Sequence, residues 1–250
     1  MTGAATRPVR ILNVFPRHFD VNGDSGNALA LARRLEWAGF ELERLEVDPG
    51  DVWPGEAPDA VLIGGGTVAA QREALPALLA ERDRVRDWLA AGVPVVAVGG
   101  GFALVAETVT LPEEETPRAG LGLFRGTARA STHRAGPVLM ASERYGVLAG
   151  FVNLRQTVEP AAGVRPLATL LSPAPDAPWP GSEGVDEGAL LGSHSHGPLL
   201  ARNPALADDV IRRALARTGR GEEYATGERH ARVDALAADS LARLREQLGR

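Results

Sequence analysis

The sequence predicts an α/β protein with a central, mainly parallel sheet flanked by helices, and with an antiparallel portion in the middle of the chain. Two observations carry this prediction. Strand-like and helix-like segments alternate through the first half, as in successive βαβ units. Residues 120–172 instead hold shorter alternating runs separated by glycines and polar turns, which is typical of antiparallel strands or hairpins.

The first half contains four strand candidates with helices between them. We expect the strands at 9–15 (VRILNVF), 40–47 (FELERLEV), 60–66 (AVLIGGG) and 93–98 (VPVVAV). A helix is expected in NALALARRLEWAGF, with Gly39 at its C′ position. A second helical stretch of about 20 residues is expected around 71–91.

The second half adds hairpins, one more strand and two helices. GPVLMAS and YGVLAGFVNL are the antiparallel candidates, 172–184 is expected to be an exposed loop, and GALLGSHSHG predicts a strand. Asn203 and Pro204 fit the N-cap and N1 positions of the helix that follows. We predict a domain over 1–225 and a C-terminal helix over 226–250, either docked or partner-binding.

Composition excludes several functions. The 250 residues carry a formal net charge of −5, which argues against a protein that binds nucleic acid or an anionic membrane. There is no cysteine, so disulfides, thiolate zinc sites and a cysteine nucleophile are excluded. The N-terminus has no apolar signal core, and no run approaches the roughly 18 residues of a membrane span. We therefore expect a cytoplasmic protein without membrane insertion.

Two glycine clusters follow two of the predicted strands, at 64–66 and 99–101. In a parallel sheet both would lie at carboxyl ends of strands, where ligands bind. Neither cluster matches a phosphate-binding P-loop, and no GxGxxG follows the first strand. A nucleotide site and two ordinary tight turns are the alternatives to a catalytic elbow.

Polar side chains accompany these clusters in two places. His194 and His196 are two apart on a predicted strand and would share one face of the sheet. A metal site would need a third ligand that no local motif supplies, so we predict none. Asp24 and Asn27, in a G-D-x-G-N turn before a helix, would either cap that helix or hold a substrate or a histidine in place.

Taken together, these stretches resemble the CobB/CobQ-like class I glutamine amidotransferases, and among them the GatD-type glutaminase subunits. The resemblance rests on ILNVFPRHFDVNGDSGNALALARR, LIGGG followed by QREA, VPVVAVGGGFALV, GLGLF, GFVN and SHSHGPLLARNPALAD. It implies a flavodoxin-like amidotransferase fold. It also implies a heterodimer with a MurT-type, Mur-ligase-like protein, in which the ligase uses ATP and Mg²⁺ and this chain holds no cofactor.

The resemblance also assigns site residues, one of which breaks the family pattern. Gly99 stands where such enzymes place the nucleophilic cysteine of A-V-C-G-G-Y-Q-L, and His196 matches the general base. Gly65 and Gly66 correspond to the loop on the oxyanion side. The expected substrate-binding residues are Gly65, Gly66, Gly100, Arg134 (for the α-carboxylate) and Asn153, and the supporting residues are Asp24 and Asn27.

Three functions follow as hypotheses. Glutamine hydrolysis needs a thiolate to form a thioester, which Gly99 cannot do, so the chain is first expected to be a glutaminase-dead partner of the ligase. An active subunit would require that Gly99 is engineered or that the alignment misplaces the nucleophile. The third hypothesis is a repurposed pocket in which His196 and Arg134 bind glutamine or another small carboxylate. Glycine at the elbow would also relieve backbone strain of about 1–3 kcal/mol.

Overall fold

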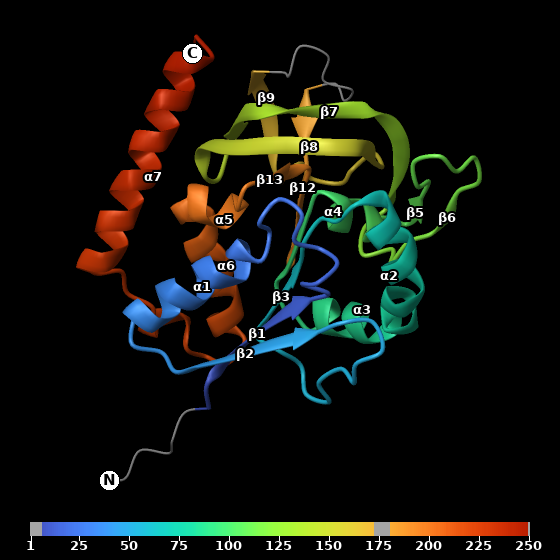
Figure 1. Ribbon diagram of the computed structural model, residues 1–250. Helices are drawn as coiled ribbons and strands as arrows, with labels where there is room; N and C mark the ends of the chain where they lie inside the picture. The colour runs from blue at the N-terminus through green and yellow to red at the C-terminus, as the bar shows by residue number, and fades with distance from the viewer. Residues whose placement is uncertain (1–6, 173–180, 250) are drawn as a thin grey trace.

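The computed structural model describes residues 7–172 and 181–249, which form two sheets with helices packed around them (Figure 1). The first sheet has the strand order β11-β12-β4-β3-β1-β2. Its pairs are parallel except for β11, which runs antiparallel to β12. Its strands are β1 (Val9–Val14), β2 (Leu42–Val47), β3 (Ala60–Ile63), β4 (Val95–Val98), β11 (Val185–Glu187) and β12 (Leu190–Ser193). The predicted mainly parallel α/β sheet is confirmed.

The second sheet comes mostly from the middle of the chain and is largely antiparallel, as expected. A long hairpin of β7 and β8 dominates it and lies across the top of the molecule in Figure 1. The strands of this sheet are β5 (Thr108–Val109), β6 (Arg118–Ala119), β7 (Gly126–Ser142), β8 (Gly146–Pro160), β9 (Ala168–Ser172), β10 (Ser182–Glu183) and β13 (Ser195–His196). The loop expected at 172–184 falls mainly on 173–180, outside the described residues, but its end forms β10.

Helices cover both faces of the first sheet, with α1, α5 and α6 on one side and α2 and α3 on the other (Figure 1). The helices are α1 (Gly26–Trp37), α2 (Val68–Ala80), α3 (Arg82–Ala90), α4 (Gly100–Leu104), α5 (Leu199–Arg202), α6 (Pro204–Ala216) and α7 (Glu228–Gln247), with a 3₁₀ turn at Gly221–Glu223. Gly39 follows α1 with φ 87°, as its predicted C′ position requires.

The helical stretch expected around 71–91 is confirmed, but two helices occupy it. Glu81 leaves the helical conformation at φ −101° and ψ 10°. The chain restarts as α3, which buries Val85 and Trp88 in the core under the sheet. Core packing therefore overrides the continuous helical pattern of the sequence.

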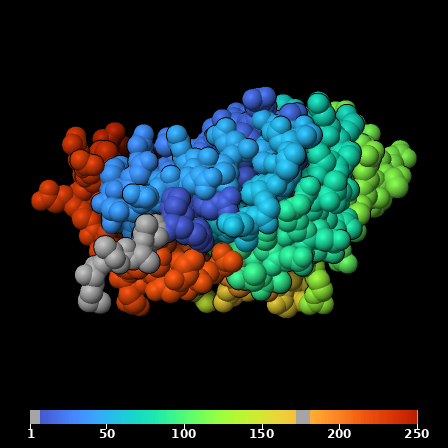
Figure 2. All heavy atoms as spheres, turned by 90° about the horizontal axis from the view of Figure 1, so that it is seen from below, coloured from blue at the N-terminus to red at the C-terminus, as the bar shows by residue number. Residues whose placement is uncertain are grey.

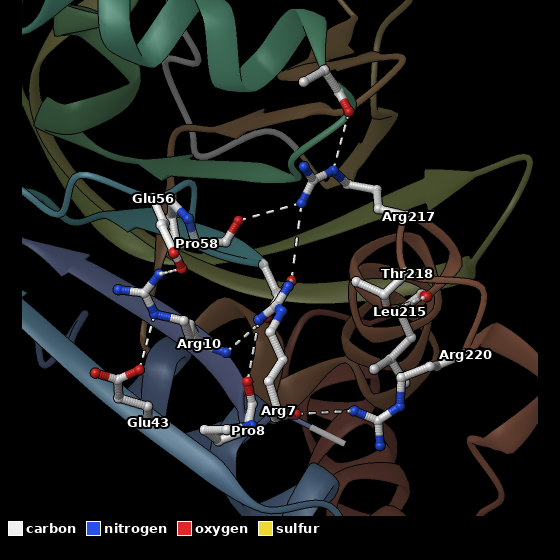
Figure 3. Close-up of polar contacts among 12 residues, drawn as sticks. Arg7, Pro8, Arg10, Glu43, Glu56, Pro58, Leu215, Arg217, Thr218 and Arg220 are labelled. Atoms are coloured by element: carbon white, nitrogen blue, oxygen red, sulfur yellow. Dashed lines mark hydrogen bonds and ion pairs between the residues drawn. The ribbon is translucent and has the colours of Figure 1, made fainter. Parts of the chain in front are cut away.

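The amino ends of the parallel strands are closed by arginines from distant segments (Figure 3). Arg7 forms two hydrogen bonds to the buried carboxylate of Asp59, at 2.7 and 2.6 Å. Arg217 and Arg220, which follow α6, donate to backbone oxygens of Pro58 and Arg7. These contacts fix the start of β1 and the start of β3 at the edge opposite the glycine clusters.

The C-terminal helix α7 lies along one side of the molecule, and the β5–β6 excursion projects at the other end (Figures 1 and 2). His230, near the start of α7, is fully buried, and its Nε2 lies 2.9 Å from the backbone oxygen of Arg34. Arg34 also forms an ion pair with Asp234 at 2.6 Å. Near its end Leu244 packs on Leu139. No helix in the described ranges is both long and apolar enough to cross a membrane.

Candidate functional site

A cavity of about 480 Å³ opens at the carboxyl ends of β3 and β4, between the glycine clusters and the β7–β8 hairpin. A pocket of this size admits a small metabolite. Its wall combines three glycines of the two clusters with polar side chains from the second sheet, from α2 and from the loop between β5 and β6. Its lining includes Gly66, Gly99, Gly100, Gln71, Arg72, Glu113, His133, Asn153, Arg155, Gln156 and His196.

Gly99 forms the tip of a strand-to-helix elbow between β4 and α4. Its backbone has φ 53° and ψ −121°, a conformation that side-chain-bearing residues rarely adopt. Its N–H donates to the backbone oxygen of Ser193 at 2.8 Å, which joins the elbow to the end of β12. The strained elbow geometry is therefore present, and glycine occupies it at little cost.

The imidazole ring of His196 fills the space that a side chain at position 99 would need. A Cβ atom built on Gly99 would lie 1.8 Å from Cε1 and 2.3 Å from Nε2 of His196. A Cβ on Gly65 would come within 2.6 Å of the same Cε1. His196 is only 1% exposed, so the ring is buried at this position. Both glycines are thus required by the position of this ring.

Asp24 orients that ring. Its Oδ2 lies 2.7 Å from Nδ1 of His196 and also accepts the N–H of Gly65 at 2.8 Å. In the neutral ring, an Nδ1–H that donates to Asp24 leaves the lone pair on Nε2. Among the described residues neither His196 Nε2 nor Asp24 Oδ1 has a hydrogen-bond partner. The pair has the arrangement of a general base held by a carboxylate.

The alternative that Asp24 and Asn27 cap the following helix is wrong. The N-cap of α1 is Ser25, without a side-chain capping bond. Asn27 is buried, and its Oδ1 accepts the N–H of Leu200 at the start of α5. Asn27 therefore ties α1 to the segment that directly follows His196.

His194 and His196 do not share one strand, contrary to expectation. The chain passes from β12 in the first sheet to β13 in the second at this point, so the two rings have different surroundings. His194 Nε2 accepts the backbone N–H of Val158 at 2.9 Å, and its Nδ1 lies 2.7 Å from Glu183 Oε2. The ring also packs edge-on against Phe102. His194 is a structural residue behind the elbow.

Glu183 is a buried supporting residue that the sequence did not reveal, since it lies in a Pro/Gly/Ser-rich stretch. Its Oε1 accepts the Ser193 hydroxyl at 2.7 Å and the His194 N–H at 2.8 Å. Burial alone would raise the pKa of Glu183. The charge interaction with His194 and the hydrogen bonds from His194 and Ser193 outweigh burial, so this pKa lies below its ordinary value. Glu183 thereby holds the turn that leads into His196.

The arginine expected to bind a carboxylate is not brought to the cavity. Arg134 lies opposite Leu154, at an irregularity in the pairing of β7 with β8, and is not among the described lining residues. Its neighbour His133 lines the cavity instead, because successive residues of a strand face opposite sides. Arg155 and Arg72 are the arginines of the lining.

Asn153 does line the cavity, where it connects two walls. Its Oδ1 lies 3.0 Å from His133 Nε2, and its Nδ2 donates to Asn22 Oδ1 at 2.8 Å. Asn22 belongs to the same loop as Asp24. The structure thus gathers Asn153, Asp24 and the expected glycines around His196.

Gln71 is the most buried lining residue that sequence reasoning missed, although the stretch QREA contained it. The side chain is 4% exposed, and its Nε2 donates to the backbone oxygen of Gly66 at 3.1 Å. That bond fixes the orientation of the amide, since a carbonyl oxygen only accepts. Gln71 Oε1 has no partner among the described residues.

Comparison with solved structures supports the class of protein that this fold and elbow define, a glutamine amidotransferase-like α/β protein. One crystal structure of a glutamine amidotransferase matches with a TM-score of 0.55 and 20% identity, over 81% of this chain and 98% of that one. A second, from Thermotoga maritima, matches with a TM-score of 0.52 and 13% identity, over 93% and 91%. At these identities the likeness concerns the fold alone.

The sequence gives the family. Residues 10–204 match the CobB/CobQ-like glutamine amidotransferase domain, and the chain belongs to this family. It is 25% identical to the GatD subunit of the glutamine-hydrolyzing lipid II isoglutaminyl synthase of Staphylococcus aureus, over 78% of this chain and 80% of that subunit. The corresponding subunit of Streptococcus pneumoniae is 25% identical, over 83% and 80%. The chain is thus GatD-like.

Proposed function

We propose that this chain is a GatD-like subunit that has lost glutamine hydrolysis and acts as a non-catalytic partner of a Mur-ligase-like, ATP-dependent ligase in amide or peptide bond formation. The observation that carries the proposal is the pair Gly99 and His196. The elbow holds no nucleophile, and the histidine ring occupies the space where one would project. A thioester route requires a thiolate, and the chain contains no cysteine.

The hydroxyl groups near the site support the same proposal. Ser193 Oγ donates to Glu183, and Ser195 Oγ points to the sulfur of Met140. Thr67 lines the cavity, but its hydroxyl caps α2 by accepting the N–H of Ala70. None of these three hydroxyls donates to His196 Nε2, as a hydroxyl nucleophile activated by this histidine would.

The partner is inferred from the relatives. The two GatD proteins are each named as a subunit of a glutamine-hydrolyzing lipid II isoglutaminyl synthase. We propose that this chain forms a heterodimer with a MurT-type protein. That ligase would bind ATP and Mg²⁺, and this chain would stabilise it or shape its acceptor site while the ligase uses free ammonia or another amine.

Two measurements test the proposal. Purified protein incubated with glutamine should release no ammonia above the buffer background, since loss of a nucleophile lowers turnover by about 10⁶-fold in well-studied hydrolases. Measurable glutaminase activity would overturn the proposal and favour the active-subunit hypothesis. Co-expression with a Mur-ligase-like protein from the same genome should give one heterodimer peak in size-exclusion chromatography.

A repurposed pocket is the second candidate. It is favoured by the cavity itself, in which His196 Nε2 is buried without a partner among the described residues while Arg155 and Arg72 supply positive charge. On this proposal the cavity binds a small carboxylated ligand. Failure of the heterodimer to form, together with absent glutaminase activity, would select this candidate.

A further inference from the structure

We infer that the cavity beside Gly99 binds a primary ammonium group, carried by a small basic amino acid, between His196 Nε2 and Gln71 Oε1. The inference rests on the proposed loss of glutamine hydrolysis, because it assigns the old substrate site to a different ligand. It concerns binding only and involves no covalent step.

Three buried acceptor atoms at or beside the cavity lack a partner in the described part of the chain. Within the described residues, His196 Nε2, Gln71 Oε1 and Asp24 Oδ1 have no hydrogen-bond partner. Their residues are only 1%, 4% and 2% exposed. Buried polar atoms are normally satisfied, so three acceptors gathered at one site call for a ligand with several donors.

The orientations of both lining side chains are fixed by their other bonds. His196 gives its Nδ1–H to Asp24, which leaves the Nε2 lone pair. Gln71 gives its Nε2–H to Gly66, which leaves Oε1 to accept. Both residues line the same cavity. An ammonium group has three donors and no acceptor, so it can donate to both of the free acceptors, His196 Nε2 and Gln71 Oε1.

Charge favours an ammonium group over a carboxamide. The Asp24 side chain is 0% exposed, and its carboxylate has only two described donors, His196 Nδ1 and Gly65 N–H. A buried carboxylate is stabilised by a nearby cation, which an ammonium group beside His196 would supply. The oxygen of a glutamine amide would instead add a further acceptor beside His196 Nε2 and Gln71 Oε1.

The remainder of the cavity suits an amino acid. Arg72 and Arg155, which form ion pairs with Glu114 and Glu113, line it together with Gln71 and His196. A carboxylate on the ligand would meet one of these guanidinium groups. A volume of about 480 Å³ is ample for an amino acid of ordinary size.

The test compares three amino acids of matched side-chain length on the full chain by isothermal titration calorimetry. L-ornithine ends in an ammonium group, L-glutamine in a carboxamide and L-norleucine in a methyl group. We expect ornithine to bind at least about tenfold more tightly than either of the others. Ammonia release is measured in the same samples.

Variants locate the binding site. Gln71→Glu gives up the hydrogen bond to the Gly66 oxygen but keeps the size and places a negative charge in the cavity, so it should tighten ornithine binding relative to glutamine binding. Gln71→Leu removes the acceptor and should weaken ornithine binding about tenfold. Gln247→Leu, on α7 away from the cavity, is the matched control and should leave the affinity unchanged. Circular dichroism confirms that each variant is folded.

Nitrogen NMR of the imidazoles gives an independent readout, since the chain has only five histidines. We expect the nitrogen signals of His196 to shift when ornithine binds. No shift of these signals, equal or tighter binding of intact glutamine, or no binding by any of the three would each overturn the inference while leaving the proposed function standing. Ammonia release from glutamine would overturn the proposed function itself.

Discussion

Asp24 Oδ2 and His196 Nδ1 lie 2.7 Å apart although 172 positions separate the two residues in the chain. Their side chains are 0% and 2% exposed, so the contact is closed to solvent. The pair therefore retains the orientation of a general base even though the elbow presents no nucleophile to it.

Replacing Asp24 by asparagine should destabilise the protein and disturb the histidine. The amide oxygen can still accept from His196 Nδ1 and Gly65 N–H, as Oδ2 does, but the amide NH2 group then replaces Oδ1, which has no partner among the described residues, and a buried donor left unsatisfied costs about 1–3 kcal/mol. Urea unfolding measures the loss. Asp239→Asn, at an exposed position on α7, serves as the control and should stay within about 0.5 kcal/mol. An Asp24→Asn protein as stable as the control would contradict the role of this carboxylate.

Gly99→Cys should neither restore glutaminase activity nor leave stability unchanged. The new side chain would clash with the His196 ring. It would also stand on a backbone with positive φ, and that strain alone costs about 1–3 kcal/mol. Gly39→Cys provides the matched control, because Gly39 has φ 87° but no atom within 4 Å of its Cβ position. We expect Gly99→Cys to lower the free energy of unfolding by at least about 1 kcal/mol more than this control. Glutamine hydrolysis by Gly99→Cys would show instead that the ring moves aside readily.

Acid should destabilise the protein partly through Glu183. Its pKa is lowered in the folded state from an ordinary value of 4.5, so its contribution to stability is present above that pH and is lost as the pH falls through the folded pKa. In Glu183→Gln this contribution is absent at every pH. The difference in unfolding free energy between wild type and variant should therefore shrink below about pH 4.5 in urea titrations. A difference that stays constant from pH 7 to pH 3 would refute the assignment.

Two leucines of α7 should respond differently to truncation. Leu244 is 7% exposed and packs with Leu139 and Ala149, whereas Leu236 is 63% exposed. Leu244→Ala should lower the free energy of unfolding by about 2 kcal/mol, measured by heat or urea. Leu236→Ala should change it by no more than about 0.5 kcal/mol. Equal effects would mean that the helix does not rest on the β7–β8 hairpin through Leu244.

Much of the fold could be predicted because periodicity reports directly on parallel strands and amphipathic helices. The break at Glu81 could not, since the residues on both sides favour a helix and only packing of Val85 and Trp88 requires two. The passage from β12 to β13 at His194 was equally hidden. The sequence pattern of an apolar run is the same whether the run stays in one sheet or crosses to another.

The site was predicted in part. Gly99 and His196 came from the resemblance to the family, and the turn containing Asp24 suggested a partner for a histidine. Arg134 was misplaced because the pairing of β7 with β8 shifts between Ala130 and Arg134, which no spacing along the sequence reveals. Side-chain direction at such an irregularity depends on the partner strand.

The position of β12 has a consequence for how the molecule is made. β12 pairs with β4 in the interior of the first sheet, yet β4 ends at Val98 and β12 begins only at Leu190. During synthesis one edge of β4 stays unpaired until β12 has been made, and an unpaired strand edge can pair with other chains. Contacts this distant along the chain also form slowly. The residues that close the edge lead directly into His196, so the open strand edge is removed in the same step that brings the histidine to the elbow.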